Sequence, residues 1–231
     1  NMMGVEYLPI NPGSAGKAVT GYDIRIFGEN GQELGPNEEG YVVIKLPLPP
    51  GTMMDLWNEN ARFKEGYLEK FPGYYFSGDG GFKDKDGYIY ITGRVDDVIN
   101  VAGHRLSTAE MEEIVSSHHS VAECAVIGIN DELKGQVPLA LVVNKLGENI
   151  EHFQLQHEVV QLVREQIGAV ASLRDVVIVP RLPKTRSGKI LRKLLRQIAD
   201  GADYTVPSTI DDPASLPEIA GLMQTKGLVS A

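Results

Sequence analysis

The stretch Gly93-Arg94-Val95-Asp96-Asp97-Val98-Ile99-Asn100-Val101-Ala102-Gly103-His104-Arg105-Leu106 lies near the middle of the 231-residue chain. Short strand-like segments and turns precede it, whereas strand-like and helical segments alternate after it. It therefore marks a boundary between two architectures. Its two arginines flank an aspartate pair, and a guanidinium is suited to binding phosphate and ligand hydroxyl groups. By itself, the pattern is also typical of a β-hairpin with two solvated arginines.

Before this boundary, residues 1–93 are predicted to form an antiparallel sheet or half-barrel. Strand-like segments lie at 22–27, 40–46, 74–76 and 88–92. Asn30-Gly31 and Asp86-Gly87 are turn signals between such segments, because these dipeptides readily adopt the positive φ angles of tight turns. Pro47 ends the second strand, since proline cannot donate to a β-ladder.

After the boundary, the apolar periodicity predicts strands and helices followed by an irregular tail at 201–231. Ser107-Thr108-Ala109-Glu110 has the pattern of a capping box, which predicts a helix start there. Further helices are predicted at 153–167 and 188–199, and three strands at 122–129, 138–143 and 175–179. The predicted fold class is therefore α/β (α+β), with a small three-stranded domain after a β-rich segment.

The composition excludes several classes of protein. With 42% hydrophobic and 23% charged residues, the chain is typical of a globular protein and not of a disordered one. Its net charge of −9 disfavours nucleic acid and anionic membranes as partners. No apolar run approaches the length of a membrane span. We therefore expect no nucleic-acid partner and no membrane association.

The chain has one cysteine, Cys124, which excludes an internal disulfide and fits a reducing compartment. We expect the cytoplasm, or the mitochondrial matrix if the source is a eukaryote. Cys124 lies in the apolar segment 122–129, so a buried, unreactive thiol is predicted. No metal site is predicted, because supporting cysteines or carboxylates at ligand spacing are missing around the histidines His104, His118, His119 and His157.

A second motif, Tyr75-Phe76-Ser77-Gly78-Asp79, precedes the boundary stretch. It places a carboxylate beside a glycine at the predicted end of an aromatic strand. Such a carboxylate can accept hydrogen bonds from two vicinal ribose hydroxyls. Aspartates that only cap a turn are common, so the motif alone also fits that simpler role.

The third motif, Leu182-Pro183-Lys184-Thr185-Arg186-Ser187-Gly188-Lys189, begins a basic segment. Residues 184–196 include no acidic residue and six cations, which are Lys184, Arg186, Lys189, Arg192, Lys193 and Arg196. The alternatives are a solvated helix face, a nucleic-acid contact and an anion site; missing interleaved aromatic residues disfavour nucleic acid. Ser187-Gly188 is predicted to open a helix, whose N-terminal amides favour anions. A lysine in that first turn opposes the helix dipole, so Lys189 indicates an anionic partner.

These three motifs, in this order, resemble the later motifs of the AMP-forming acyl-CoA synthetases, within the wider family of adenylating enzymes. The resemblance extends over essentially the whole chain and is greatest for short-chain, acetyl-CoA synthetase-like members. It implies that Asp79 binds the ribose of ATP, that Arg94 contacts the nucleotide and that Arg105 lies near the phosphate during adenylate formation. It also implies that Lys189 is the catalytic lysine, which stabilises charge between carboxylate and α-phosphate, and that Asp96 is the hinge of a rotating lid.

The resemblance also implies a coenzyme A site. Gly103 matches the glycine beside the pantetheine tunnel, and Ala102 stands where many acetate-activating relatives have serine. Arg164 aligns with a residue near the coenzyme A nucleotide, although a solvated helix arginine is the alternative. The implied cofactors are ATP, Mg²⁺ with ligands outside this chain, and coenzyme A. A protein acyltransferase or deacylase acting on Lys189 is a further implied partner, since acylation removes the charge.

Under this interpretation the chain contains two domains. Residues 1–95 are the β-rich end of the large AMP-binding domain, and residues 96–231 are the mobile C-terminal domain with an irregular tail. The family's Gly/Ser/Thr-rich phosphate loop ending in lysine is missing from the sequence. We therefore expect the chain to be a C-terminal fragment that does not form an acyl-adenylate alone.

The predicted function is ligation of a short-chain carboxylate to coenzyme A, with ATP cleaved to AMP and pyrophosphate. By resemblance, segments 43–51 and 71–76 favour a propionate–CoA ligase over an acetate–CoA ligase. The alternative from another class is a non-catalytic lid module that binds a nucleotide or a partner protein. The missing phosphate loop favours that module, whereas the retained polar residues of the three motifs favour the ligase.

Overall fold

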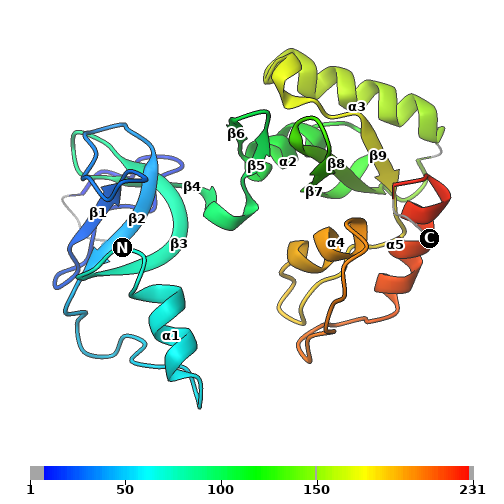
Figure 1. Ribbon diagram of the computed structural model, residues 1–231. Helices are drawn as coiled ribbons and strands as arrows, with labels where there is room; N and C mark the ends of the chain where they lie inside the picture. Colours follow the sequence, from blue (N-terminus) through cyan, green and yellow to red (C-terminus); the bar gives the residue numbers. More distant parts are fainter. Residues whose placement is uncertain (1–7, 149, 229–231) are drawn as a thin grey trace. The chain divides into compact units, whose positions relative to one another are not determined.

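The computed structural model describes residues 8–148 and 150–228. The chain divides into two units, Asn1–Asp96 and Asp97–Ala231, called here the N-terminal unit and the C-terminal unit. Figure 1 shows that each unit contains a β-sheet, and that the C-terminal unit carries most of the helices. This mixed α/β fold confirms the class predicted from the sequence.

The N-terminal unit is built on an antiparallel sheet whose strands are neighbours in chain order. The strands are β1 (Ile24–Phe27), β2 (Gly40–Lys45), β3 (Tyr74–Lys83) and β4 (Ile89–Arg94). The antiparallel sheet was expected, but helix α1 (Asn60–Tyr67) was not. Phe63 is the buried residue of α1, so its sequence shows little apolar periodicity. The rings of Tyr67 in α1 and Tyr75 in β3 stack with centroids 5.3 Å apart.

Strand β3 continues beyond the position where the sequence predicts its end. Asp79 was expected at a strand terminus, but β3 runs on to Lys83 and contains Asp79 in its interior. The prediction failed because the segment Gly78–Gly81 is rich in glycine, which carries no side chain to mark a strand. The register between β3 and β4 shifts next to this segment: Gly80 pairs with Gly93 and Gly81 with Ile91, so β4 has an extra residue, Thr92, at this β-bulge.

The C-terminal unit contains a sheet of five strands, in which β6, β5, β8 and β7 are neighbours in that order and β9 pairs with β8. The strands are β5 (Ile99–Val101), β6 (His104–Leu106), β7 (Val121–Asp131), β8 (Gly135–Asn144) and β9 (Asp175–Ile178). Only the β8–β9 pair is parallel within the described part of the chain. The prediction of three strands is wrong, because the β5–β6 hairpin joins the sheet through the pairing of Val101 with Gly135.

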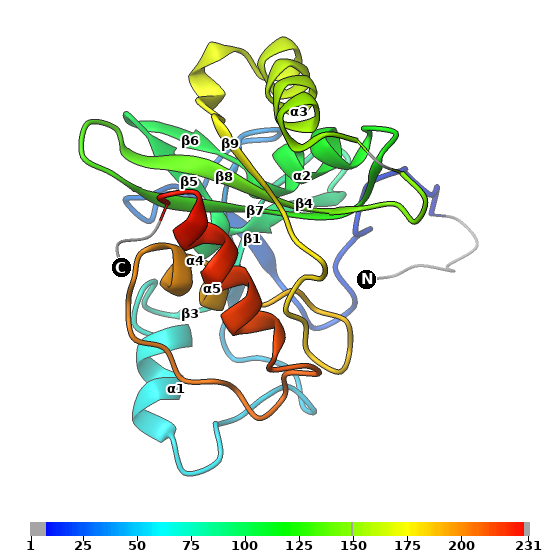
Figure 2. The same ribbon diagram turned by 90° about the vertical axis from the view of Figure 1, so that its right-hand side faces the viewer.

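Helices cover both faces of this sheet. They are α2 (Thr108–Ser116), α3 (His152–Gln166), α4 (Arg192–Ala199) and α5 (Ser215–Thr225), with short 3-10 segments η1 (Val95–Asp97) and η2 (Ala169–Ala171). Helices α2 and α3 lie on one face of the sheet, and α4 and α5 lie on the other (Figure 2). Side chains alternate along a strand, so Val126 of β7 packs in the cluster with α2 and α3, whereas its neighbour Ile127 packs in the cluster with α4 and α5. Because both faces are buried, β7 and β8 read as nearly continuous apolar runs.

Helix α2 begins where the sequence predicts it, since the Ser107 hydroxyl accepts a hydrogen bond from the Glu110 amide over 3.3 Å. Two other predictions are wrong. Helix α4 begins at Arg192 and not at 188, because a tight turn precedes it. Helix α5 lies in the segment predicted to be an irregular tail. Its buried residues follow helical spacing: Leu216, Ile219 and Met223.

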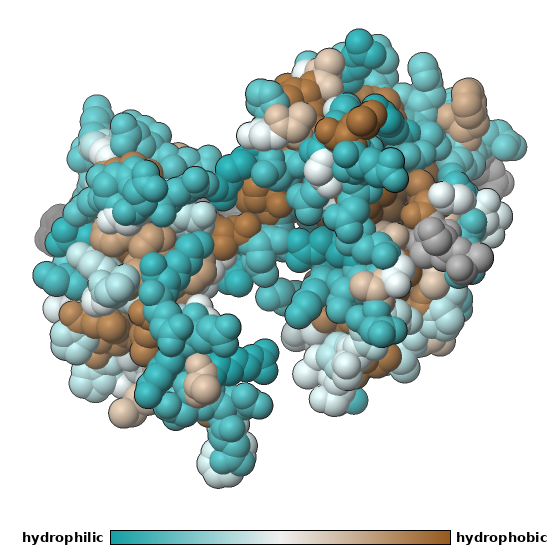
Figure 3. All heavy atoms as spheres, in the orientation of Figure 1, coloured by the Kyte–Doolittle hydropathy of each residue, from teal (hydrophilic) through white to brown (hydrophobic). Residues whose placement is uncertain are grey.

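Hydrophilic residues cover most of the face of each unit that Figure 3 shows, with smaller hydrophobic areas between them. Within residues 8–148 and 150–228, no helix is both long and apolar enough to cross a membrane. Among the residues singled out by the sequence, Arg94, Asp96 and Lys189 are exposed. The polar chemistry of the motifs is therefore accessible on the surface of its own unit.

Candidate functional site

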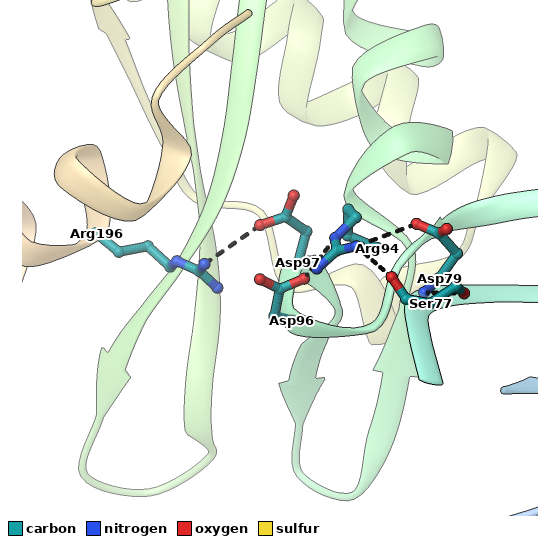
Figure 4. A network of polar contacts seen from close by, with 6 residues as sticks. All are labelled: Ser77, Asp79, Arg94, Asp96, Asp97 and Arg196. Atoms are coloured by element: carbon teal, nitrogen blue, oxygen red, sulfur yellow. Dashed lines mark hydrogen bonds and ion pairs between the residues drawn. The ribbon is translucent and has the colours of Figure 1, made fainter. Parts of the chain in front are cut away.

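Asp79 and Arg94 lie directly opposite each other in the register of β3 and β4. Arg94 Nη1 donates to Asp79 Oδ1 over 3.3 Å and to the Ser77 carbonyl oxygen over 2.9 Å. Arg94 Nε donates to Asp96 Oδ1 over 3.0 Å (Figure 4). One guanidinium thus links the ribose-binding candidate to the hinge candidate. The sequence analysis selects Asp79, Arg94 and Asp96 as site candidates, but it does not predict that they contact one another.

This cluster is partly open to solvent. The side chains of Asp79, Arg94 and Asp96 are 34%, 44% and 62% exposed, respectively. Burial opposes the charge on Arg94, but the carboxylates of Asp96 and Asp79 outweigh it and raise the pKa of the guanidinium above its ordinary value. Ion pairs this exposed contribute little to stability, typically about 0.2–1 kcal/mol. The cluster therefore presents a cation and a carboxylate, side by side, to a ligand.

Gly78 makes the position of Arg94 sterically possible. A Cβ atom built on Gly78 would lie 2.5 Å from Arg94 Nη2, well inside van der Waals contact. Gly78 also has a φ of +78°, which disfavours residues with a side chain. On either side of it, the Ser77 hydroxyl donates to the Val42 carbonyl oxygen over 2.9 Å and accepts from the Asp79 amide over 3.1 Å. The backbone under Arg94 is therefore fixed to the neighbouring strand.

A cavity of about 280 Å³ lies beside Arg94 in the N-terminal unit. Arg62 and Tyr67 of α1 line it together with Arg94 and the backbone of Gly78. Arg62 forms no hydrogen bond or ion pair with another residue that the structure describes, so its charge is available to an anion. The sequence analysis missed Arg62 because it predicted no helix at α1.

Asp96 and Asp97, which the sequence alone could not tell apart, have different environments. Asp96 pairs with Arg94 in the N-terminal unit, as described above. Asp97 is the first residue of the C-terminal unit, and its Oδ1 lies 3.2 Å from Nη2 of Arg196 on α4 (Figure 4). The Asp97 side chain is 18% exposed, far less than that of Asp96. The sequence treats Arg196 only as one of six basic residues.

The coenzyme A candidates Ala102 and Gly103 form the turn between β5 and β6. Their φ angles are +49° and +88°, and the Ala102 amide donates to the Lys134 carbonyl oxygen over 2.8 Å. A Cβ atom built on Gly103 would meet nothing within 4 Å, so the turn is open at this position. Arg105 is exposed on β6. It belongs to the C-terminal unit, so no single unit brings it together with Asp79 and Arg94.

Lys189 lies in a tight turn and not in a helix. The Thr185 amide donates to the Lys189 carbonyl oxygen over 2.8 Å, and the Thr185 hydroxyl accepts from the Lys189 amide over 3.1 Å. The Gly188 amide donates to the Thr185 carbonyl oxygen over 2.8 Å, and Lys184 pairs with Ile190 as an isolated β-bridge. These local bonds outcompete the predicted helix start. The helix-dipole argument for an anion at Lys189 is therefore wrong, although the exposed lysine remains.

The six cations of the basic segment fall into two groups. Three of them pair with carboxylates of the C-terminal unit: Lys184 with Glu123, Arg192 with Glu112 and Arg196 with Asp97. The side chains of Arg186, Lys189 and Lys193 are exposed and form no hydrogen bond or ion pair with another described residue. Three of the six cations therefore form ion pairs within the unit. The cations that remain for a ligand lie in the Lys189 turn and at Lys193, close after it in the sequence.

The remaining candidates lie apart from these groups. Arg164 is exposed in the last turn of α3 and forms no hydrogen bond or ion pair with another described residue. Cys124 of β7 is buried against α2 as a free thiol, and burial raises the pKa of its thiol. His118 Nε2 lies 2.8 Å from Glu158 Oε2, a contact that joins the end of α2 to α3. Within the described residues, no group of three His, Cys, Asp or Glu could hold a metal ion.

The chain is similar to several known proteins. Residues 110–189 match the AMP-binding enzyme C-terminal domain. Over 92% of its length the chain is 50% identical to mouse acyl-CoA synthetase short-chain family member 3, mitochondrial, and covers 31% of that protein. Over 93% of its length it is 43% identical to the acetyl-coenzyme A synthetase of Pyrobaculum aerophilum and covers 32% of it.

The fold also has counterparts among solved structures. The anthranilate CoA ligase AuaEII in complex with anthranoyl-AMP aligns with a TM-score of 0.70 at 31% identity, over 83% of this chain and 36% of that one. The chain spans about a third of the length of the curated relatives that it matches.

Proposed function

We propose that the chain supplies the lid and part of the nucleotide site of an ATP-dependent ligase, because residues 110–189 match the AMP-binding enzyme C-terminal domain and the chain is similar to a portion of short-chain acyl-CoA synthetases. The complete enzyme joins a short-chain carboxylate to coenzyme A through an acyl-adenylate. AMP and pyrophosphate are the other products.

The observation that carries this proposal is the cross-strand pair of Asp79 and Arg94. A carboxylate that accepts from two hydroxyls, next to a permanent cation, is complementary to the ribose and phosphate of a nucleotide. Arg62 adds a second guanidinium at the same cavity. Arg94 and Arg62 would supply positive charge for the phosphate of a nucleotide whose ribose binds Asp79.

We further propose that the C-terminal unit is a mobile lid with its hinge at Asp96, as the resemblance implies. The division of the chain between Asp96 and Asp97 supports this assignment. Residues at the end of a structural element are suited to absorb large torsion changes. The β-rich residues 1–95 would then complete the large domain, and residues 96–231 would move.

The chemistry assigned to the lid consists of two displacements. In the first, a carboxylate oxygen of the substrate attacks the α-phosphorus of ATP and pyrophosphate leaves. The exposed ammonium of Lys189 would stabilise the negative charge that accumulates between the substrate carboxylate and the α-phosphate. In the second, the sulfur of coenzyme A loses its proton and attacks the acyl carbonyl, and AMP leaves. The open turn at Ala102–Gly103 would lie along the path of the thiol, and Arg164 would contact the coenzyme A nucleotide.

Substrate and cofactors follow from the same premise. We favour propionate over acetate, on the resemblance of segments 43–51 and 71–76, and the first relative named above is described only as short-chain. ATP and coenzyme A are the cofactors proposed for this chain's residues. Mg²⁺ would be held outside this chain, so no step above depends on it.

The cytoplasm or the mitochondrial matrix is the proposed compartment. The exposed side chain of Lys189 is accessible to an acyltransferase or deacylase.

A non-catalytic lid module is the second candidate. Such a module would bind a nucleotide through Asp79 and Arg94 without forming an acyl-adenylate. A purified 231-residue chain that binds AMP but shows no carboxylate-dependent pyrophosphate exchange fits both candidates. If pyrophosphate exchange recovers when the large N-terminal domain of a ligase is added, the chain is part of a ligase. If exchange still does not occur, the chain is a non-catalytic module.

The sharper experiment separates the two half-reactions in the complete enzyme. Lys189→Ala should lower carboxylate-dependent pyrophosphate exchange by about 10²–10³, the usual effect of losing one preorganised electrostatic contact. Thioester formation from preformed acyl-adenylate should survive. Gly103→Leu should do the reverse, because its side chain would fill the path of the thiol.

Two matched variants control for nonspecific damage. Lys193→Ala removes a neighbouring exposed lysine and should leave both half-reactions intact. Gly103→Ala has the same unfavourable φ angle as Gly103→Leu but a small side chain, so it should form thioester at a rate near that of the wild type. Loss of the same half-reaction in Lys189→Ala and Gly103→Leu would contradict the two-position mechanism.

A further inference from the structure

The carboxylates of Asp96 and Asp97 are held by arginines of different units. Arg94, the partner of Asp96, is itself bonded to Ser77 and Asp79 on β3. Arg196, a partner of Asp97, lies on α4 and is separated from it by 99 positions in the sequence. Each carboxylate therefore ties one side of the boundary to the unit on that side (Figure 4).

The contact on the C-terminal side is the better protected of the two. The side chains of Asp97 and Arg196 are 18% and 24% exposed, whereas those of Asp96 and Arg94 are 62% and 44% exposed. Less solvent screens the Asp97–Arg196 pair, so it should resist separation more than a fully exposed pair would. The pair is therefore suited to persist while the boundary changes its torsions.

Helix α4 gives this contact a rigid base. Its buried face, Leu194, Leu195, Ile198 and Ala199, packs in the core beneath β7 and β8. At its first residue, Arg192 Nε and Nη2 donate to the two carboxylate oxygens of Glu112 on α2 over 2.9 and 2.6 Å. Immediately before it, the Leu191 amide donates to the Pro183 carbonyl oxygen over 2.9 Å, which closes the base of the Lys189 turn. Arg196 is thus fixed to the same body as Lys189.

We propose that Arg196 is a positioning residue, which acts through Asp97 so that the first residue of the lid moves as one body with α4 and the Lys189 turn. Because Arg94 and Arg196 restrain the two sides, rotation is confined to the torsions that flank the Asp96–Asp97 peptide bond. No contact with a reacting group is assigned to Arg196. The lid, its rotation and the role of Arg196 in catalysis rest on the proposed function, whereas the restraint of Asp97 by Arg196, its mechanical role, does not.

Amide hydrogen exchange in the 231-residue chain tests the mechanical role. Arg196→Gln should raise the exchange rate of the amides of residues 97–99 about fivefold, as expected for losing one partly buried ion pair. Asp97→Asn should have the same effect, and the double variant should add little, because both changes remove one contact. Lys193→Gln, an exposed change on the same helix, is the matched control and should leave these amides unaffected. Unchanged exchange in both single variants, or a uniform rise across α4 and β7, overturns the proposal.

Half-reaction rates in the complete enzyme test the catalytic role. Arg196→Gln should change the ratio of pyrophosphate exchange to thioester formation, and the reversed pair Asp97→Arg with Arg196→Asp should restore it at least in part. A purely structural role would lower both rates together and leave the ratio unmoved, which overturns the proposal. If the wild-type enzyme shows no carboxylate-dependent exchange, the proposed ligase function fails, and the hydrogen-exchange result still decides the mechanical role.

Discussion

Arg94 Nη1 lies 3.3 Å from Asp79 Oδ1 across a directly opposed residue pair of β3 and β4. The long separation and partial exposure leave the carboxylate able to accept further hydrogen bonds. A nucleotide that bound Asp79 through its ribose would therefore find a cation already in place beside it. This arrangement connects the strand register to the ligand chemistry.

Discrimination against 2′-deoxy-ATP tests the ribose role of Asp79. Losing a hydrogen bond to a charged acceptor costs about 1.5–3 kcal/mol, roughly 10- to 100-fold in binding. The complete enzyme should therefore prefer ATP over 2′-deoxy-ATP in kcat/KM for pyrophosphate exchange, and Asp79→Asn should reduce that preference. Equal discrimination by wild type and variant would mean that Asp79 does not contact the 2′-hydroxyl.

Gly78→Ala should displace the Arg94 guanidinium, because its Cβ atom would lie 2.5 Å from Arg94 Nη2. The matched control is Gly87→Ala in the β3–β4 turn, where φ is +85° and a Cβ atom meets nothing within 4 Å. Both variants should lose about 1–2 kcal/mol of unfolding free energy from backbone strain. Only Gly78→Ala should also raise the KM for ATP. A similar KM in both variants would show that Arg94 does not depend on the space over Gly78.

Replacement of Asp96 by proline should separate the half-reactions. Proline fixes φ at about −65° and should hold the lid in one position. The rate of one half-reaction should therefore fall far more than the rate of the other. Asp96→Ala also removes the carboxylate that accepts from Arg94 Nε, but it leaves φ free, so it serves as the control. Equal losses in both half-reactions of the proline variant, with a lower melting temperature, would indicate a folding defect instead.

Cys124 should resist alkylation while the protein is folded. Its thiol is buried, and burial raises its pKa, so the reactive thiolate is scarcer at every pH than in an exposed cysteine with a pKa of about 8.5. At pH 8, iodoacetamide should modify the urea-unfolded chain quickly and the folded chain slowly, as measured by intact mass. Rapid modification of the folded chain, without loss of its circular dichroism spectrum, would contradict this assignment.

The sequence by itself determined the elements with a strong apolar period and indicated the candidate site residues. Helix α3 and strands β7, β8 and β9 were predicted close to their observed positions, because buried faces impose regular spacing. The three motifs identified Asp79, Arg94 and Lys189. Prediction failed where the periodic signal was weak or local bonds prevailed: in the glycine-rich part of β3, in α1 with one buried residue, and at the Lys189 turn.

Only the tertiary structure decided which polar residues meet. The sequence does not indicate that Arg94 lies opposite Asp79, since the strand register and the extra residue Thr92 on β4 set that pairing. It likewise treats Asp96 and Asp97 as equivalent neighbours. The two carboxylates differ in their partners. Asp96 accepts from Arg94, which ends the strand just before it, whereas Asp97 contacts Arg196 of α4, which is 99 positions away in the sequence. Periodicity reports which side chains are buried, but contacts between distant charged residues depend on how the buried elements pack.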